Sequence, residues 1–222
     1  MPTPISDLLR TAAAYVFDND GTLVDTETLW IETYNRLLAP YGVTHALAVQ
    51  RSMMGLSPQA CVEAMQRAYP ALPQGFEAME ALIQERRRLF QAVRAERGIT
   101  PLPGVEAFLR KAKQGGTRLA MATSATREDI SAQLARLGWQ GLFEVVVTAD
   151  DITRHKPAPD AYLEAARQLG VEPGRCLAFE DAGNGLRSAH AAGMPVVFVR
   201  DARFEVEAPV AVEGTVGSFE EL

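Results

Sequence analysis

Short apolar runs alternate with amphipathic helical patterns along most of the chain, and this alternation restricts the fold more than any other feature. The runs are AAAYVF (12–17), RLAMATS (118–124), FEVVVTADD (143–151), RCLAFED (175–181) and MPVVFVRD (194–201). Strands of a parallel sheet are buried on both faces, so they read as nearly continuous apolar runs. The helical patterns between the runs end at glycines, which are frequent helix stops. The sequence therefore predicts an α/β fold with a doubly wound, Rossmann-like parallel sheet.

Residues 26–99 interrupt this alternation. The segment carries helical patterns and no convincing strand; one pattern begins with Ser57 as a helix cap and another stops at Gly98. We therefore expect an α/β core formed by residues 1–25 and 100–222, with an inserted all-helical cap domain between them. Ligands bind beyond the carboxyl ends of the strands in open α/β sheets. An insertion after the first strand is thus expected to act as a lid.

The charge balance and cysteine content narrow the class of protein. The 222 residues carry a net charge of −6, which argues against nucleic acid as the main partner because phosphate backbones favour a basic face. Cys61 and Cys176 lie far apart in apolar surroundings, so we expect buried free thiols. The N-terminal segment is too short and too poorly flanked for a signal peptide or membrane span. We expect a cytoplasmic protein without a membrane partner.

An acidic stretch follows the first apolar run. The segment YVFDNDGTLVDTE contains Asp18, Asp20 and Asp25, although burying a carboxylate costs several kcal/mol unless something compensates. Turn chemistry alone is one alternative, since Asp and Gly favour turns. A calcium-binding EF-hand is another, but Val16 would occupy its first ligand position, and a strand precedes it where a helix is required.

Further polar residues follow other apolar runs. Glu180 and Asp181 end one run, Thr123 and Ser124 end another, and Lys156 comes after a third. Because the carboxyl ends of parallel strands meet at one edge, we expect these residues to join the acidic stretch there. Carboxylates with a lysine and hydroxyls suit a hard cation and an anionic oxygen ligand, and Mg²⁺ is bound in this way. GNGLRS resembles a dinucleotide-binding motif, but acids precede it and its third glycine is replaced by serine.

These segments, in this order, resemble the motifs of the haloacid dehalogenase superfamily. The matching segments are FDNDGTLVDTE, MATS, the lysine of HKPAPD, and FEDAGNG. The resemblance covers nearly the whole chain, and the layout of the helical insertion is similar to that of β-phosphoglucomutase and small sugar-phosphate phosphatases. It implies a Mg²⁺-dependent phosphatase that hydrolyses small phosphorylated metabolites, such as sugar or sugar-acid phosphates, through an aspartyl-phosphate. Phosphoglycolate is one candidate substrate.

The resemblance also implies roles for individual residues. Asp18 would be the nucleophile, Asp20 the general acid and base, and Thr123 and Lys156 the groups that hold the phosphoryl oxygens. Two further residues would contribute backbone groups near the substrate phosphate, namely Ser124 and Ala125.

The magnesium ion would also be bound by residues of these motifs. The resemblance implies that the Asp18 carboxylate, the Asp20 backbone carbonyl and Asp181 bind Mg²⁺. Glu180 would act as a direct or water-mediated ligand.

Two alternatives to a phosphatase stay open. The first is a phosphomutase of the β-phosphoglucomutase type, whose cap supplies a histidine, a lysine and an arginine to the sugar. In this sequence the corresponding positions, aligned around Gly55, hold Trp30, Met54 and Pro58, although Arg51 lies one turn away. None of the three aligned side chains can carry a proton or a charge to a hydroxyl, which favours hydrolysis. The second alternative is a metal-binding regulator without turnover.

Overall fold

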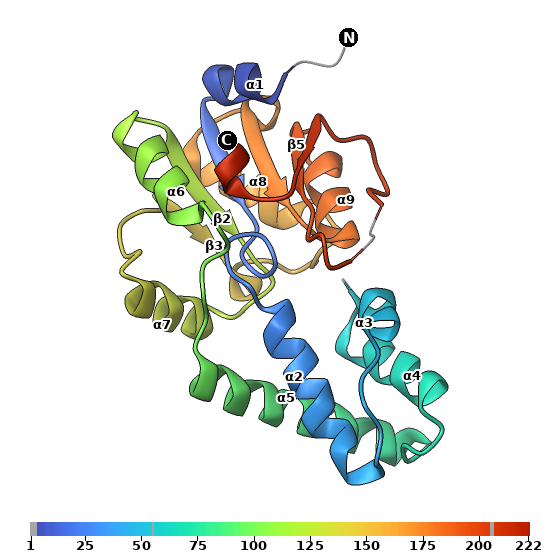
Figure 1. The fold of residues 1–222 in the computed structure, drawn as a ribbon. Coiled ribbons are helices and arrows are strands. Elements are labelled where there is room, and N and C mark those ends of the chain that lie inside the picture. The colour runs from blue at the N-terminus through green and yellow to red at the C-terminus, as the bar shows by residue number, and fades with distance from the viewer. Residues whose placement is uncertain (1–3, 55, 205–206) are drawn as a thin grey trace. The chain divides into compact units, whose positions relative to one another are not determined.

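The computed structural model describes residues 4–54, 56–204 and 207–222, and the chain divides into two compact units (Figure 1). The sheet unit consists of Met1–Val24 and Pro101–Leu222, and the helical unit of Asp25–Thr100. The strands of the sheet unit are β1 (Ala14–Phe17), β2 (Arg118–Ala122), β3 (Val145–Val147), β4 (Cys176–Glu180), β5 (Val196–Val199) and β6 (Gly214–Val216). Its helices are α1 (Ile5–Thr11), α6 (Val105–Gln114), α7 (Arg127–Leu137), α8 (Asp160–Leu169) and α9 (Gly183–Ala191), with 3-10 turns at Ala149–Asp151, Pro173–Arg175 and Phe219–Glu221.

The six strands form one parallel sheet in the order β3-β2-β1-β4-β5-β6. Chain order runs outward in both directions from the central pair, β1 and β4, so the sheet reverses its winding between these two strands. Doubly wound sheets bind ligands in the crevice at such a switch point. The predicted α/β fold with a doubly wound parallel sheet is confirmed.

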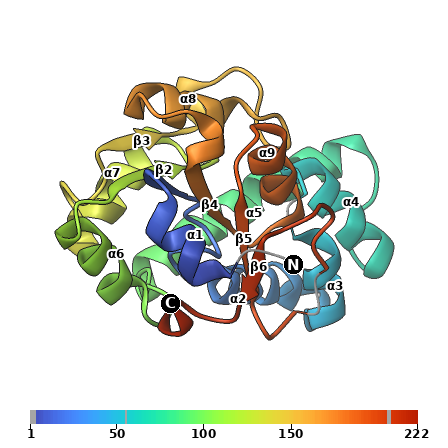
Figure 2. The ribbon, with the colours of Figure 1, turned by 90° about the horizontal axis from the view of Figure 1, so that it is seen from above.

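The two faces of the sheet bury different kinds of side chain. Successive strand residues point to opposite faces, so Val16 packs among small aliphatic residues with α8 and α9, while Phe17 faces the other side. There the Phe17 and Phe179 rings stack with their centroids 4.8 Å apart, and Phe108 of α6 packs edge-on against both. Figure 2 shows α8 and α6 on opposite sides of the strands. Both faces are therefore covered, as the continuous apolar runs predict.

Two elements of the sheet unit lie outside the expected pattern. β6 has only three residues and includes a glycine, so it carries no apolar run that sequence reading could detect, although it pairs with β5 from Gly214 to Val216. α1 has Ile5, Leu8 and Leu9 at helical spacing, but it is short and none of its residues is fully buried.

The helical unit contains α2 (Glu27–Leu38), α3 (Leu47–Met53), α4 (Pro58–Ala68) and α5 (Phe76–Arg97), with a 3-10 turn at Ala39–Tyr41. α2 packs along α5 (Figure 1), and its Tyr34 and Leu38 are buried with Val62 and Met65 of α4. As expected, Gly98 ends α5. Among the residues that the structure describes, no helix has the length and apolar character needed to cross a membrane.

Ser57 caps α4, because its hydroxyl accepts a hydrogen bond from the Ala60 N–H at 3.2 Å. We predict that Ser57→Ala lowers the free energy of unfolding of the helical unit by about 1 kcal/mol, the usual value of such a cap. Urea denaturation measures the loss. Ser57→Asp is the matched control, since its carboxylate can accept the same bond; an equal loss in both variants would contradict the capping role.

Candidate active site

The carboxyl ends of β1 and β4 bring two acids to the switch point of the sheet. Phe17 of β1 lies opposite Phe179 of β4, and the Asp18 N–H donates to the Phe179 carbonyl at 3.0 Å. Asp18 therefore leaves the sheet level with Glu180, the last residue of β4. Asp181 follows directly, and ligand oxygens of the three acids all lie within 4.8 Å of one another.

Lys156 inserts its ammonium group between two of these acids. It comes from the segment between β3 and α8, and its Nζ lies 2.5 Å from Asp18 Oδ1 and 2.6 Å from Glu180 Oε1. The Lys156 side chain is only 8% exposed, and the Asp18 and Glu180 side chains are 10% and 1% exposed. The contacts are thus charge-assisted hydrogen bonds in a site shielded from water.

Burial and neighbouring charges shift the pKa values of Asp18 and Lys156. Burial raises the pKa of Asp18 to about 7; the Lys156 ammonium opposes this rise, while the charges of Glu180 and Asp20 add to it. Burial alone lowers the pKa of Lys156, but the charges of Asp18 and Glu180 outweigh it and raise that pKa above its ordinary value. Lys156 is therefore a cation at neutral pH. A bound divalent cation would lower the pKa of Asp18 in the same way as Lys156 does.

Glu180 accepts hydrogen bonds on both carboxylate oxygens. Oε1 accepts from Lys156 and from the Tyr162 hydroxyl at 2.8 Å, and Oε2 accepts from the backbone N–H groups of Asp181 and Ala182 at 3.1 and 3.3 Å. A carboxylate can accept about four hydrogen bonds, one on each lone pair. The four donors therefore use the full accepting capacity of Glu180. Glu180 is held in one orientation by the protein itself.

The donor set fits a hard divalent cation. Three buried carboxylates lie together and a single lysine contacts two of them, so negative charge exceeds positive charge in a site shielded from water. Oxygen ligands from Asp and Glu are those that Mg²⁺ and Ca²⁺ prefer. Because the internal donors already engage Glu180, Asp18 and Asp181 are the carboxylates best able to hold such an ion.

Two glycines allow the backbone to approach these acids. A side chain at Gly185 of α9 would place its Cβ 1.7 Å from Glu180 Oε1. Gly21 has φ +85°, a conformation that favours glycine, and its Cβ would lie 2.2 Å from Asp181 Oδ2. Glycine is therefore required at these positions of FDNDGTLVDTE and FEDAGNG because a larger residue would collide with Asp181 or Glu180.

The remaining predicted residues follow the same edge of the sheet. Asp20 lies three residues beyond the end of β1, and its charge contributes to the raised pKa of Asp18. Thr123 is buried just beyond β2, and its Oγ1 accepts from the Ala125 N–H at 3.1 Å, which shapes the loop that carries exposed Ser124. The structure therefore brings Asp18, Lys156, Glu180 and Asp181 together, and places the Thr123–Ala125 loop after the neighbouring strand β2.

Several residues at this site were not anticipated from the sequence. Tyr162 supports Glu180 from α8, and Thr22 donates its hydroxyl to Asp181 Oδ1 at 2.9 Å. Tyr162 reads as one more apolar position on a helix, so the sequence gives no signal for it. Thr22 could have been noticed as a hydroxyl within the acidic stretch. The EF-hand alternative is wrong, because a strand and not a helix precedes Asp18.

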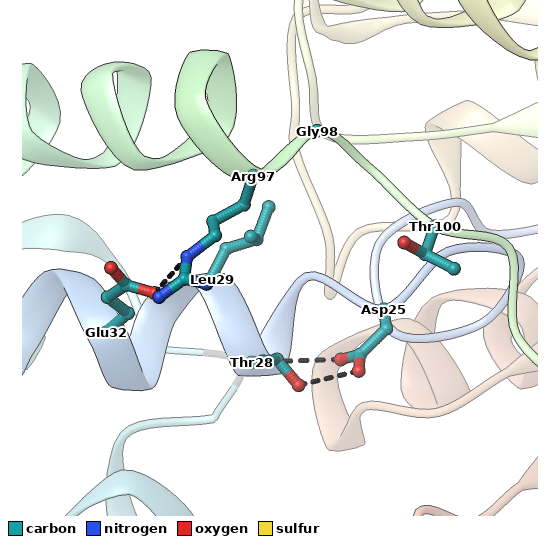
Figure 3. Close-up of a pocket in the computed structure, with 7 residues that line it drawn as sticks. All are labelled: Asp25, Thr28, Leu29, Glu32, Arg97, Gly98 and Thr100. Atoms are coloured by element: carbon teal, nitrogen blue, oxygen red, sulfur yellow. Dashed lines mark hydrogen bonds and ion pairs between the residues drawn. The ribbon is translucent and has the colours of Figure 1, made fainter.

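A separate pocket of about 260 Å³ lies in the helical unit (Figure 3). Its polar groups already bond to one another: Asp25 accepts from the Thr28 hydroxyl at 2.6 Å, and Arg97 donates to Glu32 at 2.9 Å. None of the residues proposed to hold the phosphate or metal lines this pocket. We assign it no ligand.

The sheet order and the motif residues at its switch point define a doubly wound, Rossmann-like core with an acidic site, and comparison with known proteins identifies the family. The chain belongs to the haloacid dehalogenase-like hydrolase family, whose pattern matches residues 15–199. The resemblance stated from the motifs is thus confirmed, as is the expectation of an enzyme, since curated relatives in this family are phosphatases.

Three similar proteins illustrate the match. Fructose-1-phosphate phosphatase YqaB of Escherichia coli is 34% identical over 193 residues, which cover 85% of this chain and 96% of that protein. The phosphorylated carbohydrates phosphatase of Thermotoga maritima is 30% identical over 185 residues, 83% of each chain. The crystal structure of CbbY from Rhodobacter sphaeroides in complex with phosphate superposes with a TM-score of 0.75 at 28% identity, and the match covers 95% of this chain and 96% of that chain.

We predict that Gly21→Ala destabilises the protein more than Gly116→Ala does. Both glycines have nearly the same positive φ, +85° and +82°, so both variants incur about 1–2 kcal/mol of left-handed strain. At Gly116 a Cβ meets nothing within 4 Å, whereas at Gly21 it displaces Asp181 from its bond with Thr22. We expect Gly21→Ala to lose about 1–3 kcal/mol more on this account.

Urea denaturation of the two variants, side by side with the parent protein, measures this difference. Equal losses at the two positions would show that backbone strain alone acts at Gly21, and would contradict the close approach to Asp181.

Proposed function

We propose that the protein is a Mg²⁺-dependent phosphatase that hydrolyses small phosphate monoesters, such as sugar or sugar-acid phosphates, through an aspartyl-phosphate on Asp18. The observation that carries this proposal is the contact of the Lys156 ammonium with Asp18 at 2.5 Å, beside two more buried acids at the switch point. The names of relatives support the substrate class: one is a fructose-1-phosphate phosphatase and another a phosphorylated carbohydrates phosphatase. Phosphoglycolate remains a candidate.

Asp18 would attack the phosphorus atom of the substrate. One carboxylate oxygen forms the new P–O bond while the bond to the leaving alcohol oxygen breaks, so the phosphoryl group is transferred to Asp18. Lys156 would bind phosphoryl oxygens and reduce their repulsion of Asp18, with Thr123 and the backbone of Ser124 and Ala125 as further donors. Such donors stabilise the charge that spreads over the equatorial oxygens in the transition state.

Asp20 would move the protons of both steps. As an acid it gives a proton to the departing oxygen, which leaves as an alcohol and not as an alkoxide. As a base it then takes a proton from the water that attacks the aspartyl-phosphate. Hydrolysis releases inorganic phosphate and regenerates Asp18 and protonated Asp20, so the cycle is balanced.

The Asp18 and Asp181 carboxylates and the Asp20 backbone carbonyl would hold Mg²⁺. When bound, the ion neutralises phosphate charge and positions the phosphoryl group. The four internal donors to Glu180 favour a water-mediated role for that residue. Glu180 would then act chiefly by fixing the orientation of Lys156.

We propose that the helical unit, Asp25–Thr100, serves as the cap of this phosphatase core. Its insertion directly after the acidic motif supports this role, since that motif supplies the nucleophile. The small phosphorylated metabolite and the cytoplasmic location stay predictions from the sequence.

We predict that the protein hydrolyses a generic aryl phosphate in the presence of Mg²⁺ and loses this activity in excess chelator. The buried carboxylates repel a phosphate dianion, so a cation must offset their negative charge before the substrate can approach Asp18. Release of phenol, followed by absorbance with and without Mg²⁺, measures the requirement.

Asp18→Asn is the matched variant for this assay. The amide is nearly isosteric but is a far weaker nucleophile than the carboxylate, so we expect a loss of at least about 10³-fold. An unchanged circular dichroism spectrum controls for folding. Full activity in chelator, or in folded Asp18→Asn, would contradict the mechanism. Metal binding by a wild-type protein that shows no turnover would favour the regulator alternative.

The alternative phosphomutase activity is less well supported by the helical unit. Trp30 is stacked on Phe90 with ring centroids 3.8 Å apart, and the Arg86 guanidinium lies 3.9 Å above its ring. An indole packed in this way can neither give nor accept the proton that a sugar hydroxyl must exchange. Gly55, around which the mutase comparison is aligned, lies outside the described residues.

We therefore predict hydrolysis and not isomerisation. β-Glucose 1-phosphate is incubated with the protein, Mg²⁺ and a trace of the corresponding bisphosphate, and both products are measured. We expect free phosphate and glucose if this sugar is accepted. Glucose 6-phosphate that accumulates faster than free phosphate would establish the mutase instead.

A further inference from the structure

A buried amide separates the two aspartates that the mechanism uses. Asn19 lies between Asp18 and Asp20 and is 0% exposed. Its backbone carbonyl accepts from the N–H groups of Leu23 and Val24 at 2.9 and 3.1 Å, which closes the loop after β1. The loop needs only the backbone of this residue for these bonds. The buried polar side chain therefore calls for a separate explanation.

The Asn19 side chain forms a reciprocal pair with Gln133 of α7. Gln133 Nε2 donates to Asn19 Oδ1 at 2.6 Å, and Asn19 Nδ2 donates to Gln133 Oε1 at 3.3 Å. Gln133 is also buried, with 3% exposure. In such a pair each oxygen must face the other's nitrogen, so the two amides lie in one plane and can flip only together. Gln133 thus holds the Asn19 amide in place, and the bond of Asn19 Nδ2 to Asp20 determines which atom of the amide faces Asp20.

The second N–H of Asn19 Nδ2 reaches Asp20. Its nitrogen lies 3.2 Å from Asp20 Oδ2. In a protonated carboxyl group the carbonyl oxygen accepts an amide N–H better than the hydroxyl oxygen does. The bond therefore restricts rotation of the Asp20 carboxyl group, holds Oδ2 toward Asn19, and favours the proton on Oδ1.

We propose that Asn19 is a positioning residue for Asp20, and that Gln133 acts through Asn19 by holding its amide. This inference rests on the proposed function, in which Asp20 protonates the leaving oxygen. General acid catalysis depends on the placement of the proton-carrying atom within hydrogen-bond reach of the acceptor. A carboxyl group that is free to rotate delivers its proton less often.

Apolar substitutions can separate this role from packing. Asn19→Leu keeps the backbone bonds and the approximate side-chain volume but removes the donor to Asp20, and it leaves the Gln133 amide without its buried partner. Asn19→Leu/Gln133→Leu removes both amides. Replacing both partners of a buried hydrogen bond with apolar groups can be nearly neutral for stability, so the double variant is expected to fold.

The experiment measures phenol release in a single turnover from a series of aryl phosphates with Mg²⁺ present. Phenyl phosphate needs a proton on its leaving oxygen, whereas p-nitrophenyl phosphate, which has a much better leaving group, does not. For the Asn19→Leu and double variants we expect a fall of about tenfold or more with phenyl phosphate and less than about threefold with p-nitrophenyl phosphate. Gln133→Leu should lower the rate in the wild-type background and leave it unchanged in the Asn19→Leu background, because it acts through Asn19.

The outcomes distinguish this inference from the proposed function. An active wild-type enzyme whose folded double variant keeps the wild-type dependence on the leaving group overturns the inference alone. An equal loss for both substrates also overturns it, because that result indicates a structural role. A folded wild-type protein that releases no phenol overturns the proposed function and this inference with it.

Discussion

Lys156 places its ammonium group between two buried carboxylates, 2.5 Å from Asp18 and 2.6 Å from Glu180. Each of the three groups alone would be costly to bury, and removing one would leave an uncompensated charge. Together they join three segments that are distant in sequence: the end of β1, the segment before α8 and the end of β4. The parallel order of the sheet makes this contact possible, because it brings the ends of β1 and β4 side by side.

The surrounding structure fixes the orientation of these charges. Tyr162 and two backbone N–H groups hold Glu180, Thr22 holds Asp181, and the Asn19–Gln133 pair lies beside Asp20. These supports come from hydroxyls, amides and backbone, which add no net charge to a site already rich in acid. They therefore restrict the rotation of the carboxylates without changing the electrostatic balance that Lys156 only partly offsets.

Most strands of the sheet unit and the motif residues of the candidate site could be predicted from the sequence. The residues that hold those motif residues in place could not. Apolar runs reveal buried strands because burial on both faces leaves a continuous pattern, and this holds for β1 and β4. β6 leaves no such pattern, since three residues at the sheet edge need few apolar side chains. The motif residues could be placed at one edge of the sheet because all its strands run in the same direction. The roles of Tyr162 and Gln133 could not be predicted, because each contacts the site from a helix. In the sequence, a buried polar residue on a helix cannot be distinguished from other residues of the core.

The charge of the site suggests why cation and substrate should depend on each other. Asp18, Asp20, Glu180 and Asp181 lie at the same end of the sheet, a single ammonium group contacts two of them, and burial raises the pKa of Asp18 to about 7. Adding a phosphate dianion alone would increase the negative charge and favour protonation of Asp18, which would remove the nucleophile. A divalent cation bound together with the dianion leaves the net charge unchanged, and it favours the ionised form of Asp18. The excess of acid at the switch point would therefore couple the binding of the proposed cation to the reactivity that we propose for Asp18.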